Sequence, residues 1–284
     1  MLKTKNIIQE MRLYQWIKNL LIFTPLIFVN KLFDLSLLGK TTIAFLSFSL
    51  MASAVYVLND IFDLPKDRLH PKKKERPLAS GKINLLAAKI LLMILFVASA
   101  LLGWLVNGSF IFILFFYFFI NIIYSYKVKN IAILDLIFIA VMYLIRVYAG
   151  AAAINVPVSN WLLLTTLFVA LFIATAKRRA EIINVRGDNN LTRKVLEEYN
   201  IQFLDYLLII TNIATIIFYA LYTMIRGGFF VWSIFFVVYA MLRYLWLVLK
   251  QGVGEEPEKI LVKDKPIVFS ILGWGIFITL VLYL

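Results

Sequence analysis

The sequence of 284 residues contains no cysteine and a single histidine, His70. Without cysteine the chain can form no disulfide, has no thiolate nucleophile and offers no sulfur ligand to a metal ion. One histidine in a basic stretch, with no second ligand nearby, does not indicate a histidine-built metal site. Any chemistry must therefore use carboxylates, lysines, arginines and tyrosines, with or without a metal ion bound through oxygen.

Charged residues are also scarce. They make up 16% of the chain, whereas 62% is hydrophobic, and the mean hydropathy is +0.88. Soluble domains contain roughly 45–50% apolar residues, so this composition predicts a polytopic membrane protein. A cleavable signal peptide is not indicated, because the first apolar run comes late and leads directly into further apolar runs.

Nine apolar runs are long enough to cross a bilayer as helices, and they predict an all-α membrane protein with one integral domain over 1–284. Lys18 and Asn19 interrupt the first run near its start. The runs lie at roughly 17–33, 41–60, 85–106, 109–126, 133–153, 158–177, 203–224, 229–249 and 266–284.

The distribution of positive charge predicts the orientation in the membrane. With nine crossings, the N-terminal segment and the loops on its side contain 23 lysines and arginines, and the opposite side contains 3. We therefore expect a cytoplasmic N-terminus, an external C-terminus and chemistry on the cytoplasmic face, where the two longest loops lie. The net charge of +13 does not indicate nucleic-acid binding, because nearly all of it lies in short loops between apolar runs.

Three aspartates stand at the end of the second apolar run, in the stretch Asn59-Asp60-Ile61-Phe62-Asp63-Leu64-Pro65-Lys66-Asp67. Their spacing of i, i+3 and i+7 places them on one face of a helix, where like charges repel unless a cation lies among them. Mg²⁺ is usually held by a few carboxylates together with a substrate's phosphates. The alternative is a solvated acidic helix end. Pro65 predicts a kink or a helix end between Asp63 and Asp67.

A strongly basic segment follows these aspartates and includes Arg68, Lys73 and Arg76. Some of its charge is explained by the positive-inside rule. An acidic face followed directly by cations also suits a diphosphate, because metal ions can neutralise its inner oxygens while basic side chains hold the outer ones. The segment therefore favours a phosphate site over a solvated helix end.

Two further groups of polar residues lie at the ends of apolar runs. Tyr124 and Lys129 precede Asp135, and Arg146 follows eleven residues later, well inside the membrane. An ionisable residue at that depth is costly, so it indicates either a function or a structural pairing with a carbonyl or an acid. The third group is Lys177-Arg178-Arg179-Ala180-Glu181, in which an i, i+4 surface ion pair is the simpler interpretation.

The pattern Asn59-Asp60-x-x-Asp63-x-x-x-Asp67 resembles the signature of the UbiA superfamily of intramembrane prenyltransferases. Further stretches, together covering about residues 12 to 266, are similar to its branch of decaprenyl-phosphate phosphoribosyltransferases. They are Trp16-Ile17-Lys18-Asn19-Leu20, Asp67-Arg68-x-His70-Pro71-x-Lys73-x-x-Arg76-Pro77, Tyr124-Ser125 with Lys129, Leu144-Ile145-Arg146, Lys177-Arg178-x-Ala180-Glu181, Leu242-Arg243-Tyr244 and Gly254-Glu255.

The resemblance implies a bundle of nine transmembrane helices around a cavity open to the cytoplasm. It also implies Mg²⁺-dependent transfer of phosphoribose from 5-phosphoribosyl diphosphate to a polyprenyl phosphate. The metal site by position would be Asn59, Asp60, Asp63 and Asp67, and the catalytic residues would be Asp60, Asp63 and Asp135. The substrate-binding residues would be Lys18, Arg68, Lys73, Arg76, Tyr124, Lys129, Arg146, Lys177, Arg178 and Glu181.

One departure from the wider superfamily separates the possible reactions. Enzymes that use prenyl diphosphates typically carry a second motif with two aspartates four residues apart, whereas here Asp135 is followed at that spacing by Ile139. This favours phosphoribosyl transfer, in which the acceptor oxygen is already anionic and needs no strong base. Transfer of a prenyl chain to an aromatic or lipid acceptor is the first alternative. A transporter or lipid-binding protein without turnover is the second.

Overall fold

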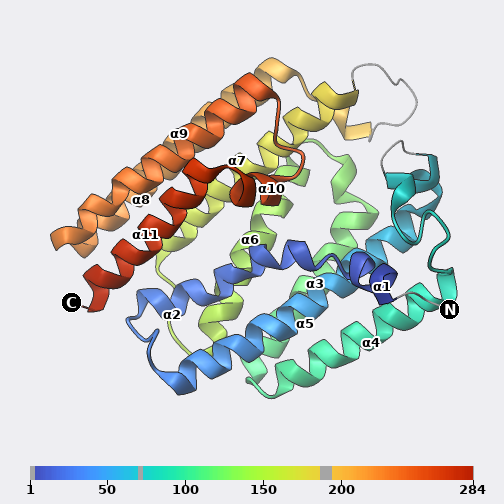
Figure 1. Cartoon of the computed structure of the whole chain (residues 1–284), viewed down its shortest axis with the longest axis horizontal. Coiled ribbons are helices and arrows are strands. Elements are labelled where there is room, and N and C mark those ends of the chain that lie inside the picture. Colours follow the sequence, from blue (N-terminus) through green and yellow to red (C-terminus); the bar gives the residue numbers. More distant parts are fainter. Residues whose placement is uncertain (1–3, 70–72, 186–193, 284) are drawn as a thin grey trace. The chain divides into compact units, whose positions relative to one another are not determined.

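The computed structural model describes residues 4–69, 73–185 and 194–283, so His70 and Lys72 lie outside the described residues. The described chain is built of helices and their connections, as Figure 1 shows, which confirms the predicted all-α class. Eight of the helical segments in these ranges are long and apolar enough to cross a membrane. The protein is therefore an integral membrane protein.

The chain divides into two compact units. Unit 1 comprises Met1–Lys129 and Ile145–Val156, and unit 2 comprises Asn130–Leu144 and Pro157–Leu284. Helix α6 (Leu134–Ala153) contributes its first half to unit 2 and its second half to unit 1.

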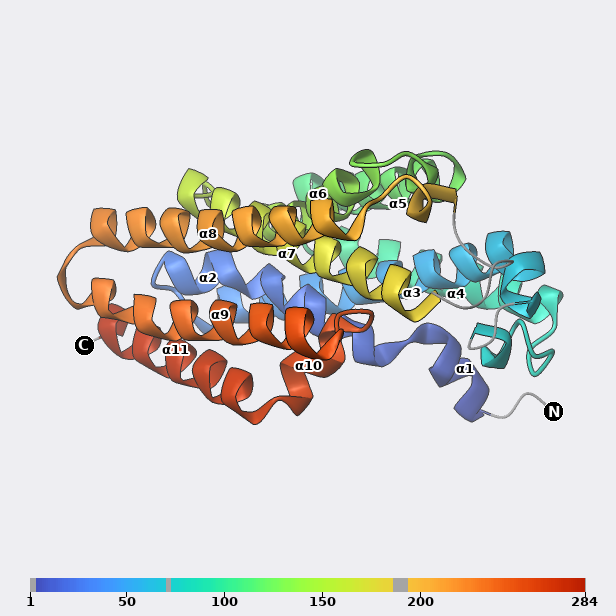
Figure 2. The ribbon, with the colours of Figure 1, turned by 90° about the horizontal axis from the view of Figure 1, so that it is seen from above.

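Unit 1 is centred on the long helix α3, which packs lengthwise against α4 (Figures 1 and 2). Their shared core includes Ala54 and Val57 of α3 and Leu95 of α4. Asn84 begins α4, because its side chain accepts a hydrogen bond from the Ala87 N–H. The helical elements of unit 1 are α1 (Thr4–Met11), η1 (Leu13–Phe23), α2 (Thr24–Phe28), α3 (Leu35–Leu69), η2 (Lys73–Glu75), α4 (Leu85–Trp104), α5 (Gly108–Tyr126) and η3 (Val128–Asn130).

The first predicted span, 17–33, differs from the others. It consists of the end of the 3₁₀ helix η1, the short helix α2 and a turn, and it is not among the eight candidate spans. A 3₁₀ helix rises about 2.0 Å per residue and an α-helix 1.5 Å, so η1 and α2 together extend about 30 Å, close to the thickness of the hydrocarbon core. The predicted count of nine crossings therefore stays a prediction.

Close contact with α6 explains where η1 lies in unit 1. A Cβ placed on Gly150 would come 2.0 Å from the carbonyl oxygen of Ile22. Only glycine allows the backbone of η1 to approach the helix so closely. Arg146, one turn earlier on α6, donates from Nε to the Asn19 side chain at 2.8 Å. These two contacts hold η1 against the second half of α6.

Unit 2 is formed by two packed helix pairs, α7 with α8 and α9 with α11 (Figure 1). One of its cores contains Phe172 of α7, Leu208 of α8, Tyr244 of α9 and Ile267 of α11. Its remaining elements, with their bounds, are α7 (Asn160–Val185), η4 (Lys194–Leu196), α8 (Ile201–Arg226), η5 (Gly228–Ser233), α9 (Ile234–Gln251), α10 (Pro257–Lys263) and α11 (Lys265–Tyr283).

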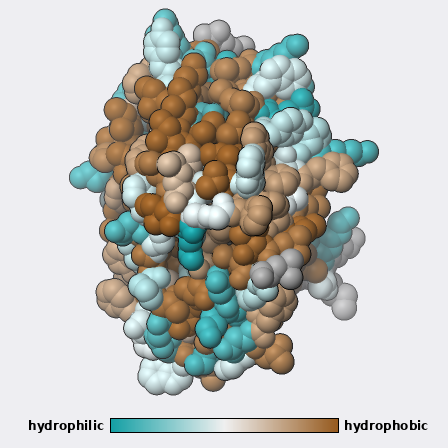
Figure 3. Space-filling model, turned by 90° about the vertical axis from the view of Figure 1, so that its left-hand side faces the viewer, coloured by the Kyte–Doolittle hydropathy of each residue, from teal (hydrophilic) through white to brown (hydrophobic). Residues whose placement is uncertain are grey.

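Large apolar side chains remain exposed on both units, among them Trp104, Phe112, Phe229 and Phe269. Figure 3 shows apolar side chains over much of the face that it presents. In water this surface would drive association, whereas in a bilayer it contacts lipid chains. The apolar character of the exposed surface is what helices that cross a membrane require, so it agrees with the eight candidate spans.

Candidate active site

The three aspartates lie on the last turns of α3, which continues through Pro65 to Leu69. Of the two outcomes predicted for Pro65, the helix end between Asp63 and Asp67 is therefore wrong, and the kink stays a prediction. Proline removes one backbone hydrogen bond and disfavours the interior of a helix. Here Arg76 binds Asp60 on one side of Pro65 and Asp67 on the other, and this bridge holds the two turns together.

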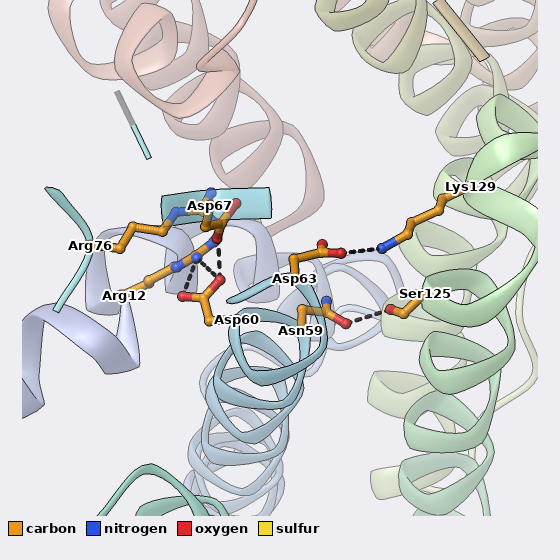
Figure 4. Close-up of polar contacts among 8 residues, drawn as sticks. All are labelled: Arg12, Asn59, Asp60, Asp63, Asp67, Arg76, Ser125 and Lys129. Atoms are coloured by element: carbon orange, nitrogen blue, oxygen red, sulfur yellow. Dashed lines mark hydrogen bonds and ion pairs between the residues drawn. The ribbon is translucent and has the colours of Figure 1, made fainter. Parts of the chain in front are cut away.

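Asp60 is the most heavily paired of the three. Its two oxygens both lie 2.5 Å from Nη2 of Arg12, and Oδ1 also accepts from Nη1 of Arg76 at 2.9 Å (Figure 4). The Asp60 side chain is 4% exposed. Arg12 adopts a left-handed backbone conformation, with φ of 53°, where α1 gives way to η1. Such a conformation is uncommon for arginine, and the ion pair with Asp60 stabilises it.

Asp67 and Asp63 bind different cations. Nη1 of Arg76, which binds Asp60, also lies 2.5 Å from Oδ2 of Asp67, whereas Asp63 accepts from Nζ of Lys129 at 2.7 Å (Figure 4). On a helix the seven-residue step from Asp60 returns to within about 20° of the same direction, but the three-residue step falls about 60° away. The expectation of one shared face therefore holds for Asp60 and Asp67, and Asp63 points to another partner.

The residue before the first aspartate is also held in place. Asn59 accepts a hydrogen bond through its side-chain oxygen from the hydroxyl of Ser125 on α5 (Figure 4). Lys129 lies four residues after Ser125, on η3. The end of α5 and the turn after it therefore contact the end of α3 through an amide and a carboxylate. Two helices therefore fix the orientation of the motif.

The donor set at the end of α3 suits a divalent cation that is held jointly with a substrate. All of its ligands are oxygens, which Mg²⁺ prefers. Asp60 and Asp67 already converge on a single cationic atom, Nη1 of Arg76. Within the described ranges, no three acidic side chains are grouped closely enough to hold an ion by themselves. The residues therefore fit an ion completed by phosphate oxygens, and they do not form a closed protein cage.

A fourth carboxylate, Glu10 on α1, lies beside this cluster. It is 1% exposed, and neither of its oxygens has a hydrogen-bond partner among the described residues. Burial, with the negative charge of Asp60 as a second cause, raises the pKa of Glu10 to about 7. The guanidinium groups of Arg12 and Arg76 and the backbone N–H of Leu78 lower the pKa of Glu10 but do not cancel this effect.

A separate acid–cation cluster lies in unit 2. Asp135 is fully buried, with Oδ1 accepting from the Tyr199 hydroxyl and Oδ2 from Nε of Arg178, each at 2.5 Å. Arg178 also donates from Nη1 to Glu181 at 2.6 Å. Burial, with the hydrogen bond to Asp135 as a second cause, raises the pKa of Tyr199, so its hydroxyl stays protonated and donates.

Residues 21–263 match the model of the UbiA prenyltransferase family. The chain belongs to this family. It is 31% identical over 277 residues to decaprenyl-phosphate phosphoribosyltransferase of Mycobacterium tuberculosis strain H37Rv, covering 95% of this chain and 91% of the relative. The enzyme of the same name from Mycolicibacterium smegmatis is also 31% identical, over 95% of this chain and 90% of that one.

The fold agrees with the family. A UbiA homologue from Archaeoglobus fulgidus bound to GPP and Mg²⁺ superposes with a TM-score of 0.74 at 16% identity, over 98% of this chain and 99% of the homologue. The family and its curated relatives confirm the predicted resemblance, and they make the protein a transferase.

Arg146 of this UbiA-family chain is held by structural contacts within unit 1. Besides Asn19 it binds the Tyr117 hydroxyl through Nη2 at 3.2 Å, and its guanidinium lies over the rings of Phe48 and Tyr117. Such contacts compensate a buried cation with dipoles and ring faces. They tie η1, α3 and α5 to α6, so Arg146 supports the fold whether or not it also meets a substrate.

The other predicted substrate-binding residues are spread over both units. Lys18 donates to Gln15 at 2.5 Å, and Arg68 is exposed beside Asp67. Lys73 on η2 is half-buried and carries a charge that acts on Asp67. Tyr124 in unit 1 and Lys177 in unit 2 are both partly exposed. Their roles in binding stay predictions.

Three residues of the two clusters were not predicted as site residues. Arg12 entered the sequence interpretation only as a charge that sets orientation, and Glu10 and Tyr199 did not enter it. Glu10 and Arg12 belong to the polar stretch before the first apolar run, where charge is expected in any membrane protein. Tyr199 is followed by Asn200, which caps α8 by accepting from the Gln202 N–H. No local pattern distinguishes these residues, because each acquires its role through a distant partner.

Proposed function

We propose that this protein transfers 5-phosphoribose from 5-phosphoribosyl diphosphate to a polyprenyl phosphate in the membrane. An oxygen of the acceptor phosphate forms a bond to C1 of the ribose. The bond between C1 and the diphosphate oxygen breaks, and its electron pair leaves with the diphosphate. The attacking oxygen is already anionic, so no side chain has to remove a proton.

The observation that carries this proposal is the pairing of each aspartate of the motif with a cation. Arg12 and Arg76 bind Asp60, Arg76 binds Asp67, and Lys129 binds Asp63. A diphosphate bound with a divalent cation offers a positive charge to the carboxylates and negative charges to the guanidinium groups. The metal ion would replace the guanidinium groups on the carboxylates, and the guanidinium groups would bind phosphate oxygens instead. The proposal is also supported by the names of relatives that are 31% identical over most of the chain.

Each part of the cluster has an expected role. Asn59, Asp60, Asp63 and Asp67 would hold Mg²⁺, which when bound neutralises the charge that develops on the leaving diphosphate. Arg12, Arg76 and Lys129 would bind phosphate oxygens of the donor. Arg12 lies at the turn between α1 and η1, Arg76 directly follows η2, and Lys129 is on η3, so all three side chains come from short segments around the end of α3. These side chains would turn from carboxylate to phosphate oxygens when the donor binds.

The state of Asp135 favours phosphoribosyl transfer over prenyl transfer. Ile139 stands where the second acidic motif would have its other aspartate. Both oxygens of Asp135 are already engaged, by Tyr199 and Arg178. The side chains of Asp135 and Arg178 are 0% and 1% exposed, so separating them would leave two buried charges unpaired, which is strongly unfavourable. Arg12 and Arg76, the partners of Asp60, are 16% and 28% exposed, so leaving Asp60 does not bury them unpaired. We therefore propose that Asp135 acts by orienting Arg178. Lys177 and Glu181, the other predicted substrate-binding residues of that group, lie next to Arg178 in the sequence.

We further propose the orientation that the charge distribution predicts. The cations of the α3 cluster belong to the side with 23 lysines and arginines, which corresponds to the cytoplasm. The water-soluble donor would enter from that side, while the acceptor's polyprenyl chain remains in the bilayer. Residues 1–284 would act as a single transferase.

Release of diphosphate by the purified protein in detergent with Mg²⁺ tests the proposal. We expect release only when 5-phosphoribosyl diphosphate and a polyprenyl phosphate are both present, and a lipid product with the β configuration at C1, because direct displacement inverts the donor's α configuration. Release from a prenyl diphosphate and an aromatic acceptor would instead identify a prenyltransferase. Binding of either lipid without any release would identify a carrier.

A further inference from the structure

Glu10 is the acidic side chain of unit 1 whose burial the ion pairs of the cluster do not explain. Both of its oxygens are inaccessible to solvent, and no described donor makes a hydrogen bond of normal geometry to them, although the Leu78 N–H lies near enough to favour its charged form. Leaving a buried polar group unsatisfied costs about 1–3 kcal/mol, and more when the group is charged. A carboxylate kept under these conditions is expected to have a partner in another state of the protein.

The charges around Glu10 indicate what that partner would be. Its carboxylate interacts electrostatically with Asp60, Arg12 and Arg76. Glu10, Asp60 and Asp67 bring three carboxylates to this part of the cluster, and the guanidinium groups that bind there are those of Arg12 and Arg76. Asp60 and Asp67 are engaged by ion pairs, and Glu10 is the carboxylate of this group that no described ion pair occupies.

The position of α1 adds a structural reason. Met11, next to Glu10, packs against the core formed by α3 and α4. The Met11 carbonyl accepts from the Ser53 hydroxyl of α3 at 2.8 Å. The backbone beside Glu10 is therefore fixed to α3. The segment that carries Glu10 is therefore anchored to the helix that carries the acidic turns, as a ligand of a defined site requires.

We propose that Glu10 is an additional carboxylate of the divalent-cation site, so that α1 forms one wall of it. This inference rests on the proposed metal-assisted transfer. Within the described residues no three acids are grouped closely enough to hold a cation by themselves, and Arg12 and Arg76 occupy Asp60. Binding of the cation with a diphosphate displaces Arg12 from Asp60, and Glu10 and Asp60 then both face the ion.

Binding of Mn²⁺ tests the proposal without requiring turnover. The purified full-length protein is titrated with Mn²⁺ in the presence of inorganic diphosphate, and free Mn²⁺ is measured by electron paramagnetic resonance. Glu10→Gln keeps the shape and removes the charge, so we expect the Kd for Mn²⁺ to rise about 10-fold or more. Glu75→Gln is the matched control, because Glu75 is an exposed acid on η2, and we expect no change.

A purely structural role predicts a different pattern. Removing a buried, unsatisfied charge should leave the Kd for Mn²⁺ unchanged while raising the thermal midpoint, and that result would overturn the proposal. Glu10→Asp, which keeps the charge one methylene short, should bind Mn²⁺ better than Glu10→Gln but less tightly than the wild type. Equal Kd values for Mn²⁺ in the wild type and both variants would overturn the role of Glu10 but leave the proposed metal-assisted function standing. Failure of the wild type to bind Mn²⁺ overturns the metal-assisted function as well.

Discussion

Nζ of Lys129 lies 2.7 Å from Oδ1 of Asp63, although 66 positions separate the two residues in the sequence. The contact joins the turn after α5 to the last turns of α3. Lys129 is 9% exposed, so its charge is little screened by solvent and acts strongly on nearby anions.

Replacing Lys129 by Met is expected to lower phosphoribosyl transfer about 10- to 100-fold, chiefly through a higher KM for 5-phosphoribosyl diphosphate. Lys127→Met is the control, because Lys127 is exposed two residues earlier, and it should transfer at the wild-type rate. Steady-state kinetics of both variants decide the matter. A Lys129→Met enzyme with an unchanged KM would show that this ammonium group does not bind the donor.

Arg12 and Asp60 should be energetically coupled. In a double-mutant cycle of Arg12→Gln and Asp60→Asn, we expect each single change to destabilise the protein, because it leaves a largely buried charge without its main partner. The double variant should be more stable than the sum predicts by about 1–3 kcal/mol. Equilibrium unfolding in mixed detergent gives these values. Strict additivity would mean that the pair contributes nothing to stability.

Tyr199 should stabilise unit 2 through its hydroxyl. That hydroxyl donates to Asp135 and accepts from the backbone N–H of Ile133 at 2.7 Å. Tyr199→Phe leaves both groups without this partner, so we expect a loss of about 1–3 kcal/mol. Tyr206→Phe, at an exposed tyrosine on α8 that bonds Gln202, is the control and should change stability by less than about 0.5 kcal/mol. Equal effects of the two variants would contradict the assignment.

Two helical glycines should respond oppositely to alanine. Gly150→Ala places a methyl group against the Ile22 carbonyl, so η1 must shift and we expect a loss of about 1–3 kcal/mol or more. A Cβ on Gly275 of α11 meets no atom within 4 Å, and alanine there should stabilise the helix by up to about 1 kcal/mol. Thermal unfolding of both variants in detergent measures the difference. A neutral Gly150→Ala would show that η1 is not held closely against α6.

The eight spans could be predicted from the sequence because length and apolar composition suffice to identify a membrane helix. The segment 17–33 has a similar composition, but its backbone is determined by tertiary contacts. Gly150 and Arg146 hold η1 from α6, and neither contact is visible in a local window of sequence. Composition identified 17–33 as an apolar segment, but its 3₁₀ conformation depends on packing against α6.

The site shows the same limit. The spacing of the aspartates predicted an acidic cluster, because a single helix fixes their relative directions. Their partners come from other elements, and Arg12 is separated from Asp60 by 48 positions. Pro65 predicted a kink or a helix end, but the helix continues to Leu69, and Arg76 bridges the turns on either side of the proline. Local rules described the helix that carries the motif, whereas the cations around it depended on the assembled unit.

Transfer of labelled phosphoribose into lipid tests the central claim most directly. The protein, purified in detergent, would be incubated with Mg²⁺, ribose-labelled 5-phosphoribosyl diphosphate and a polyprenyl phosphate, and the lipid extract would be counted. We expect label in the extract with the wild type, and none with EDTA or with Asp60→Ala. Absence of label for every polyprenyl phosphate tried, with label transferred instead from a prenyl diphosphate to an aromatic acceptor, would contradict the proposed function.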